Sequence, residues 1–153
     1  YVTGHVKPTK DAQHEVPREL VLRLARFHLI DNVYALNYTF FPEAAIEKAS
    51  LTSTVTQVQG DLVFLDFAGE SRASMEKPDK IGYEPQLLGR ATYDLKKQKF
   101  VSFELVAVGN RWGLGSCNQR HDPEPALMGI AMTLAGDSPA ERLPPAFISR
   151  YGW

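Results

Sequence analysis

The chain has 153 residues, with 17 Lys and Arg against 18 Asp and Glu, a formal net charge of −1 and 44% hydrophobic residues. This length is sufficient for one domain that buries its own core. The balanced charge argues against a nucleic-acid-binding protein, because phosphate neutralisation requires a surplus of basic side chains on one face. No segment approaches the roughly 20 apolar residues of a membrane-spanning helix. The composition therefore predicts a soluble globular domain over residues 1–153.

The two ends of the sequence predict a piece of a longer precursor with an apolar tail. The chain begins at Tyr1, without a Met or a leader segment,. Residues 136–153 are expected to be irregular because of their prolines, yet 147–153 contains two Phe or Trp residues, a Tyr and an Ile. We expect this tail to pack on its own domain. The alternative is that it contacts a neighbouring segment or subunit, which would allow self-association.

The first regular element is expected after an irregular stretch over 1–16, as a helix over 17–30. Pro17 suits the first turn of a helix, where its missing N–H costs nothing. The apolar side chains that follow recur with the spacing of one buried helix face, at Leu20, Val21, Leu24 and Phe27,. The good helix formers after Pro42 predict a second short helix over 42–49.

Residues 51–135 have the composition of β-structure. Two hairpins are expected, the first from 51–58 and 62–68 and the second from 86–94 and 100–108, with a fifth strand at 126–134. Glycines inside these strands are typical of bends. The pattern predicts an α+β fold in which a strongly curved, half-barrel-like antiparallel sheet of five or more strands packs on the N-terminal helix. Five aromatic residues could line its interior or fill its core: Phe64, Phe67, Tyr93, Phe100 and Phe103.

The stretch 109–125 is the strongest candidate for a functional site, because long irregular segments inside small domains are often functional. Its arginines can hold a carboxylate or phosphate through two parallel hydrogen bonds, and its tryptophan offers a stacking surface. We predict a ligand-binding site formed by Arg111, Trp112, Cys117, Asn118, Arg120 and His121. The ligand would be a small apolar or anionic molecule or a protein partner.

Two alternative functions remain open on the same stretch. Cys117 and His121 are close enough in sequence to meet across a turn, and nearby arginines favour the thiolate, so a thiol-dependent enzyme is possible. Metal binding is the further alternative, although the four histidines have no recognisable ligand spacing,. Asp66 and Glu104 lie in apolar strands, and the alternation of their neighbours predicts that both point to solvent. No catalytic residue, metal ligand or cofactor is assigned.

Three segments resemble a family of uncharacterised, secreted, β-rich bacterial proteins: 26–32, 88–94 and 103–113. The resemblance spans residues 17 to 147 and implies a bacterial, exported protein, either secreted or periplasmic. The architecture is similar, by analogy, to half-barrel lipoprotein carriers and lipocalin-like folds. The family carries no activity that transfers site residues to this chain. The sequence therefore favours a non-catalytic binding or interaction module.

Overall fold

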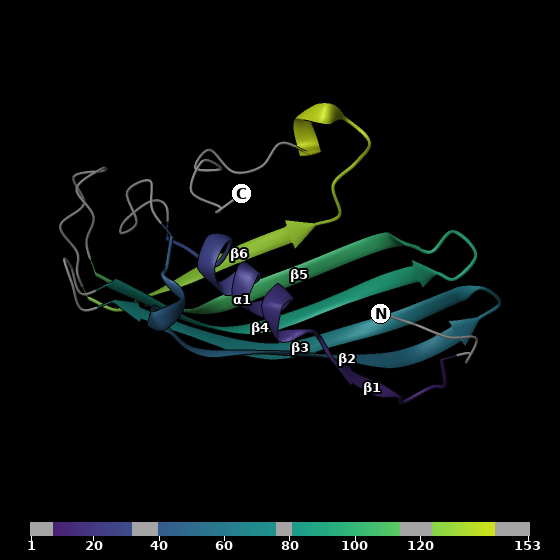
Figure 1. Cartoon of the computed structure of the whole chain (residues 1–153), viewed down its shortest axis with the longest axis horizontal. Helices are drawn as coiled ribbons and strands as arrows, with labels where there is room; N and C mark the ends of the chain where they lie inside the picture. Colours follow the sequence, from purple (N-terminus) through teal and green to yellow (C-terminus); the bar gives the residue numbers. More distant parts are fainter. Residues whose placement is uncertain (1–7, 32–39, 76–80, 114–123, 143–153) are drawn as a thin grey trace.

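The six strands of the sheet follow each other in space in the same order as in the chain (Figure 1). The computed structural model describes residues 8–31, 40–75, 81–113 and 124–142. All neighbouring strands are antiparallel. The strands are β1 (Gln13–Glu15), β2 (Ile46–Gln59), β3 (Leu62–Met75), β4 (Ile81–Asp94), β5 (Lys99–Trp112) and β6 (Ala126–Thr133). The helical elements are the α-helix α1 (Arg18–Phe27) and the short 3₁₀-helices η1 (Glu43–Ala45) and η2 (Pro139–Arg142). A β-rich α+β fold with an antiparallel sheet of five or more strands is confirmed.

Tight turns close the two predicted hairpins. Between β2 and β3, Gly60 adopts a φ of +61°, which costs a glycine little,. Between β4 and β5, the Asp94 carboxylate accepts a hydrogen bond of 2.9 Å from the backbone N–H of Lys97. The Asp94 side chain stabilises the turn because it accepts a hydrogen bond from a backbone N–H that lies outside the strand pairing,.

The helix predicted over 42–49 is wrong. Only η1 is helical there, and β2 begins at Ile46. Ile46 lies opposite Ala73 and Ser50 lies opposite Glu70, so this segment lengthens the ladder with β3. Pairing with residues twenty or more positions away in the chain outweighs the local helix preference of the Glu, Lys and Ala residues in this segment,.

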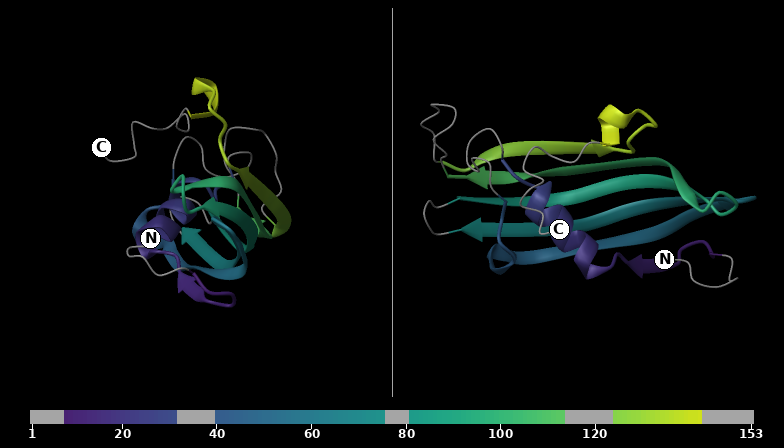
Figure 2. Two further views of the ribbon diagram at one scale, coloured as in Figure 1. Left: turned by 90° about the vertical axis from the view of Figure 1, so that its right-hand side faces the viewer. Right: turned by 45° about the horizontal axis from the view of Figure 1, so that its top comes forward.

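Helix α1 lies across one face of the sheet and contacts β2 and β3 (Figure 2, right). Its side chain Val21 shares a core cluster with Leu51, Phe67, Leu87 and Leu105 of the sheet. We call this face of the sheet the inner face and the opposite one the outer face. Within the described residues, no helix has the length and apolarity needed to cross a membrane.

A second core cluster lies where β3 ends and β4 begins. It consists of Ile30, Phe41, Ala45, Ala73 and Ile81. The backbone N–H of Phe41 donates a hydrogen bond of 3.2 Å to the carbonyl oxygen of Arg26. These contacts attach the segments on either side of residues 32–39 to the sheet.

Four of the five aromatic residues expected inside the sheet contact one another in a chain. The ring centroids of Phe67 and Phe103 are 5.8 Å apart, those of Phe103 and Phe100 6.1 Å, and those of Phe100 and Tyr93 5.2 Å. Edge-to-face pairs at such separations are favourable. Phe64 is different, because alternation along β3 places it on the face opposite Phe67,.

Candidate functional site

Two of the six predicted site residues lie in described structure, at the end of β5. Arg111 and Trp112 continue the pairing with β4, where they lie opposite Tyr83 and Gly82. The irregular stretch expected over 109–125 therefore starts later, because its first four residues are strand. The other four predicted site residues, Cys117, Asn118, Arg120 and His121, lie outside the described residues.

Arg111 is buried on the inner face and paired with an aspartate. Its Nε atom lies 3.7 Å from Oδ2 of Asp31, and the two side chains are 4% and 3% exposed. Asp31 directly follows Leu29 and Ile30, which are both buried, so the segment after α1 carries the carboxylate into the core. Charges removed from water in this way require a partner. The Arg111 charge is thus balanced inside the protein.

Tyr83 adjoins this ion pair and links two strands. Its hydroxyl oxygen lies 3.1 Å from the carbonyl oxygens of both Ala107 and Met128, to which it donates its single proton. Burial, and secondly the charge of Asp31, raise the pKa of Tyr83 to about 12. The phenol is therefore neutral at physiological pH and joins β5 to β6 rather than serving as a base.

Trp112 lies on the outer face, on the opposite side of the sheet from Arg111. Neighbouring side chains in a strand point to opposite faces. The ring lies close over Gly82, where a Cβ atom would overlap ring atoms. The guanidinium carbon of Arg72 lies 5.6 Å from the centre of the ring. Arg111 and Trp112 therefore point to opposite faces of the sheet,.

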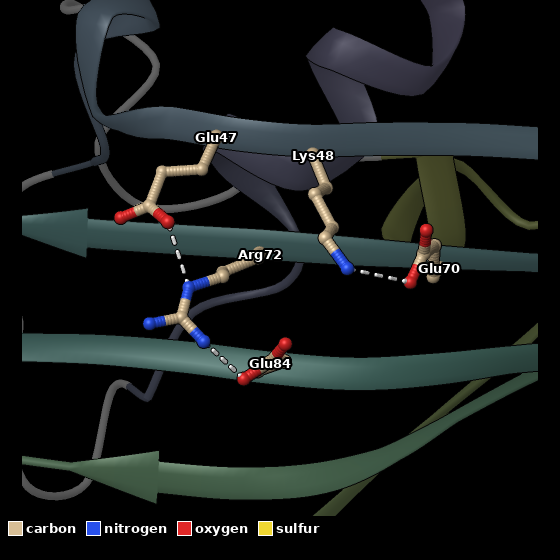
Figure 3. A network of polar contacts seen from close by, with 5 residues as sticks. All are labelled: Glu47, Lys48, Glu70, Arg72 and Glu84. Carbon is tan, nitrogen blue, oxygen red and sulfur yellow. Dashed lines mark hydrogen bonds and ion pairs between the residues drawn. The ribbon is translucent and has the colours of Figure 1, made fainter.

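Arg72, which lies over the Trp112 ring, belongs to a network of charged side chains on the outer face. Figure 3 shows this network. Arg72 donates hydrogen bonds to Glu47, at 2.7 Å, and to Glu84. Lys48 pairs with Glu70 at 3.3 Å. The predicted outward orientation of Asp66 and Glu104 is confirmed, since both are exposed. The charged groups of the three ion pairs retain contact with water, so each pair contributes little to stability,.

The inner face also carries apolar side chains that α1 leaves partly exposed. They belong to β3, β5 and β6 and pack against the main core cluster: Leu65, Phe103, Met128, Ile130 and Met132. We call this set the apolar strip. Helix α1 covers the inner face mainly over β2, with fewer contacts to β3, so β5 and β6 lie away from it. The apolar run at 126–134 predicts a strand and no more from the sequence. In the structure its side chains alternate between partly buried and exposed, and this alternation is the signal for the apolar strip.

Among the described residues, no group of three or more His, Cys, Asp or Glu side chains is arranged to hold a metal ion. On the described inner face, the apolar strip accompanies the Arg111–Asp31 ion pair and the neutral Tyr83 phenol. Known family models, curated proteins and solved structures include none that is significantly similar to this chain.

Proposed function

We propose that this protein is a non-catalytic binding module that holds an elongated apolar ligand on the inner face of its sheet. The observation that carries the proposal is the apolar strip, whose five side chains are only partly buried. Partly exposed apolar side chains gathered on one surface are typical of a binding site. An acyl chain or an apolar peptide segment has the chemistry to cover them.

An apolar ligand agrees better with the site than an anionic one. Binding an anion at Arg111 would require breaking the buried pair with Asp31, at a cost that a single ligand charge does not recover. Methionine side chains adapt to ligands of different shapes because they are unbranched and flexible. Met128 and Met132 supply such side chains on β6.

We also propose the shape that would serve this function: a half-barrel-like sheet that curves around α1. Support comes from the end-on view, in which the sheet bends toward the side on which α1 lies (Figure 2, left). The core cluster shared by Val21 and the sheet supports the packing of the N-terminal helix. Export from a bacterial cell is likewise a proposal, and it rests on the sequence resemblance alone.

The test is a titration with a long-chain fatty acid that carries a fluorescent label. We expect saturable binding to the wild-type protein and at least about tenfold weaker binding to Met132→Glu, which places a charge in the apolar strip. Leu88→Glu is the control, because Leu88 is 66% exposed on the outer face and should leave binding unchanged. Equal affinities for wild type and Met132→Glu would contradict the proposal.

The two alternatives from the sequence depend on residues outside the described ranges and stay hypotheses. A thiol-dependent enzyme would require Cys117 to react with iodoacetamide well below the ordinary thiol pKa of about 8.5. Metal binding would require a stoichiometric metal in the purified protein. Neither has support from the described residues.

A further inference from the structure

Strand β6 is an edge strand without the protection that edge strands normally carry. It lies at the end of the sheet order, and no described strand pairs with its outer edge. Its sequence, Ala126–Thr133, contains no charged residue and no proline, whereas each of the other five strands contains a charged side chain. Natural proteins usually place charges, prolines or very short strands at sheet edges to prevent pairing with another chain.

The opposite edge of the sheet shows that protection. β1 has three residues, and its exposed side chains include His14 and Glu15. A strand this short offers few backbone groups to another chain. The two edges therefore differ, and β6 alone has the length and composition of a pairing edge.

Both faces of β6 are apolar. Met128, Ile130 and Met132 lie on the inner face, while Leu127 lies on the outer face and is 76% exposed. Val106 and Val108 of β5 continue the apolar surface on the outer face, at 43% and 42% exposed. A strand that is apolar on both faces is typical of one enclosed within a larger sheet.

The backbone of β6 presents alternate residues to its free edge. The N–H of Leu134 donates to the carbonyl oxygen of Phe103 at 3.0 Å, and the β5–β6 ladder has no irregularity. Because hydrogen-bonding direction alternates along an antiparallel strand, the even-numbered residues face β5. The groups facing the free edge therefore belong to Leu127, Gly129, Ala131 and Thr133.

We propose that β6 pairs with β6 of a second copy of this chain in antiparallel orientation, which makes one continuous sheet from two. The inner faces of the two copies lie on the same side of the joined sheet only if even-numbered residues of one copy lie opposite even-numbered residues of the other. A register centred on Ile130 satisfies this condition: it places Met128 opposite Met132, and Gly129 opposite Ala131.

This pairing is self-complementary under a two-fold axis, as most homodimers are. It forms about eight backbone hydrogen bonds between the copies. No like charges meet, since β6 carries none. The pairing also joins the apolar strips of the two copies side by side, but it does not depend on what ligand they bind.

The first experiment measures the mass of the full chain in solution by light scattering. We expect wild type to have twice the mass of one chain. Ala131→Pro removes an N–H that faces the free edge and leaves the bonds to β5 intact. This substitution should weaken the dimer by at least about tenfold. Ala131→Thr retains the N–H and is the matched control, which should remain a dimer.

The second experiment tests the register and does not require the proline variant to fold. In a non-hydrogen-bonded antiparallel pair the Cα atoms are about 4.5 Å apart, which a disulfide can span. With Cys117→Ser to remove the natural thiol, Ile130→Cys should form a covalent dimer on mild oxidation. Met128→Cys should not, because its two copies would lie about 13 Å apart.

Three outcomes would overturn the proposal. The first is a wild-type monomer at all concentrations, including one that dimerises only after removal of 143–153, which would show that the chain's own tail covers β6. The second is a dimer that Ala131→Pro, shown to be folded by circular dichroism, leaves unchanged. The third is equal crosslinking of Ile130→Cys and Met128→Cys.

Discussion

The Nε atom of Arg111 and the Oδ2 atom of Asp31 lie 3.7 Å apart in the core, between the end of β5 and the segment that follows α1. The pair connects the segment after α1 to strand β5, at the edge of the second core cluster. Its neighbour Tyr83 extends the connection to β6. The segment after α1, the end of β5 and strand β6 are thereby fixed at the end of the sheet where β5 ends.

Breaking this pair should be strongly destabilising. Asp31→Ala leaves a buried guanidinium without its carboxylate, and we expect the free energy of unfolding to fall by about 3–5 kcal/mol. The double variant Asp31→Leu/Arg111→Met removes both charges and should lose less than Asp31→Ala alone. Urea denaturation of the two variants and wild type measures this difference. Losses that add independently would contradict an energetic link between the two residues.

Arg72→Ala removes surface ion pairs and serves as the comparison with the buried Arg111–Asp31 pair. Arg72 has two acidic partners, Glu47 and Glu84, but its side chain is 37% exposed. The loss in unfolding free energy should be much smaller than that of Asp31→Ala, because water and salt screen exposed pairs. The same urea experiment at low and high salt checks this difference. A loss as large as that of Asp31→Ala would mean that the outer-face network organises the sheet.

The protein should lose stability between about pH 10 and pH 12. The pKa of Tyr83 is about 12 in the folded protein and about 10 in an unfolded chain. In this range the unfolded state releases the phenol proton and the folded state retains it, so rising pH favours unfolding. Tyr83→Phe should show a smaller decline in urea midpoint with pH. A decline identical to that of wild type would assign the effect to other groups.

Stability should also fall at acid pH through Asp94. The backbone N–H of Lys97 is the main cause that lowers the pKa of this carboxyl group, with a further contribution from the Lys97 ammonium 3.2 Å away. The stabilisation is complete above the unfolded pKa of about 3.9 and is lost as pH falls through the lower folded value. Asp94→Asn keeps an oxygen acceptor for the turn but cannot titrate. Its urea midpoint should change less than that of wild type below about pH 4, and an equal change would exclude Asp94 as a source.

Gly82→Ala should disturb Trp112. A Cβ atom at position 82 would overlap the indole ring, so the ring or the strand must move, at a cost of about 1–3 kcal/mol,. Thermal unfolding and tryptophan emission measure the effect, with Trp153→Phe as the background that isolates Trp112. Gly129→Ala is the matched control, because its nearest neighbour would be Val108 at 3.8 Å, an ordinary contact. Equal effects of the two substitutions would contradict the close fit at Gly82.

The sequence predicted those parts of the fold that depend on local patterns. The β-composition of 51–58 and 62–68 predicts the first hairpin, and the apolar spacing from Leu20 predicts the helix. The start of β2 was missed, because Glu43–Ala49 favours a helix locally and only its distant partner strand makes it extended. β1 was missed for the same reason, since three polar residues carry no period and are held by β2.

The geometry of the candidate site is harder to predict from the sequence, because residues that are adjacent in a strand point to opposite faces. Arg111 and Trp112 are neighbours, but a strand directs them to opposite faces. The partner of Arg111, Asp31, lies eighty residues earlier in the chain and gave no signal. The apolar strip, in contrast, follows from alternation in β6 once its strand assignment is accepted.

The agreement between strand order and chain order also affects how the protein is made. Each of the last five strands pairs with the one synthesised just before it, so the sheet can grow by adding one strand at a time. Folding on the ribosome can proceed in this direction because contacts local in sequence form early. β6 would be added last, and its uncharged edge would become available for pairing only after the rest of the sheet had formed.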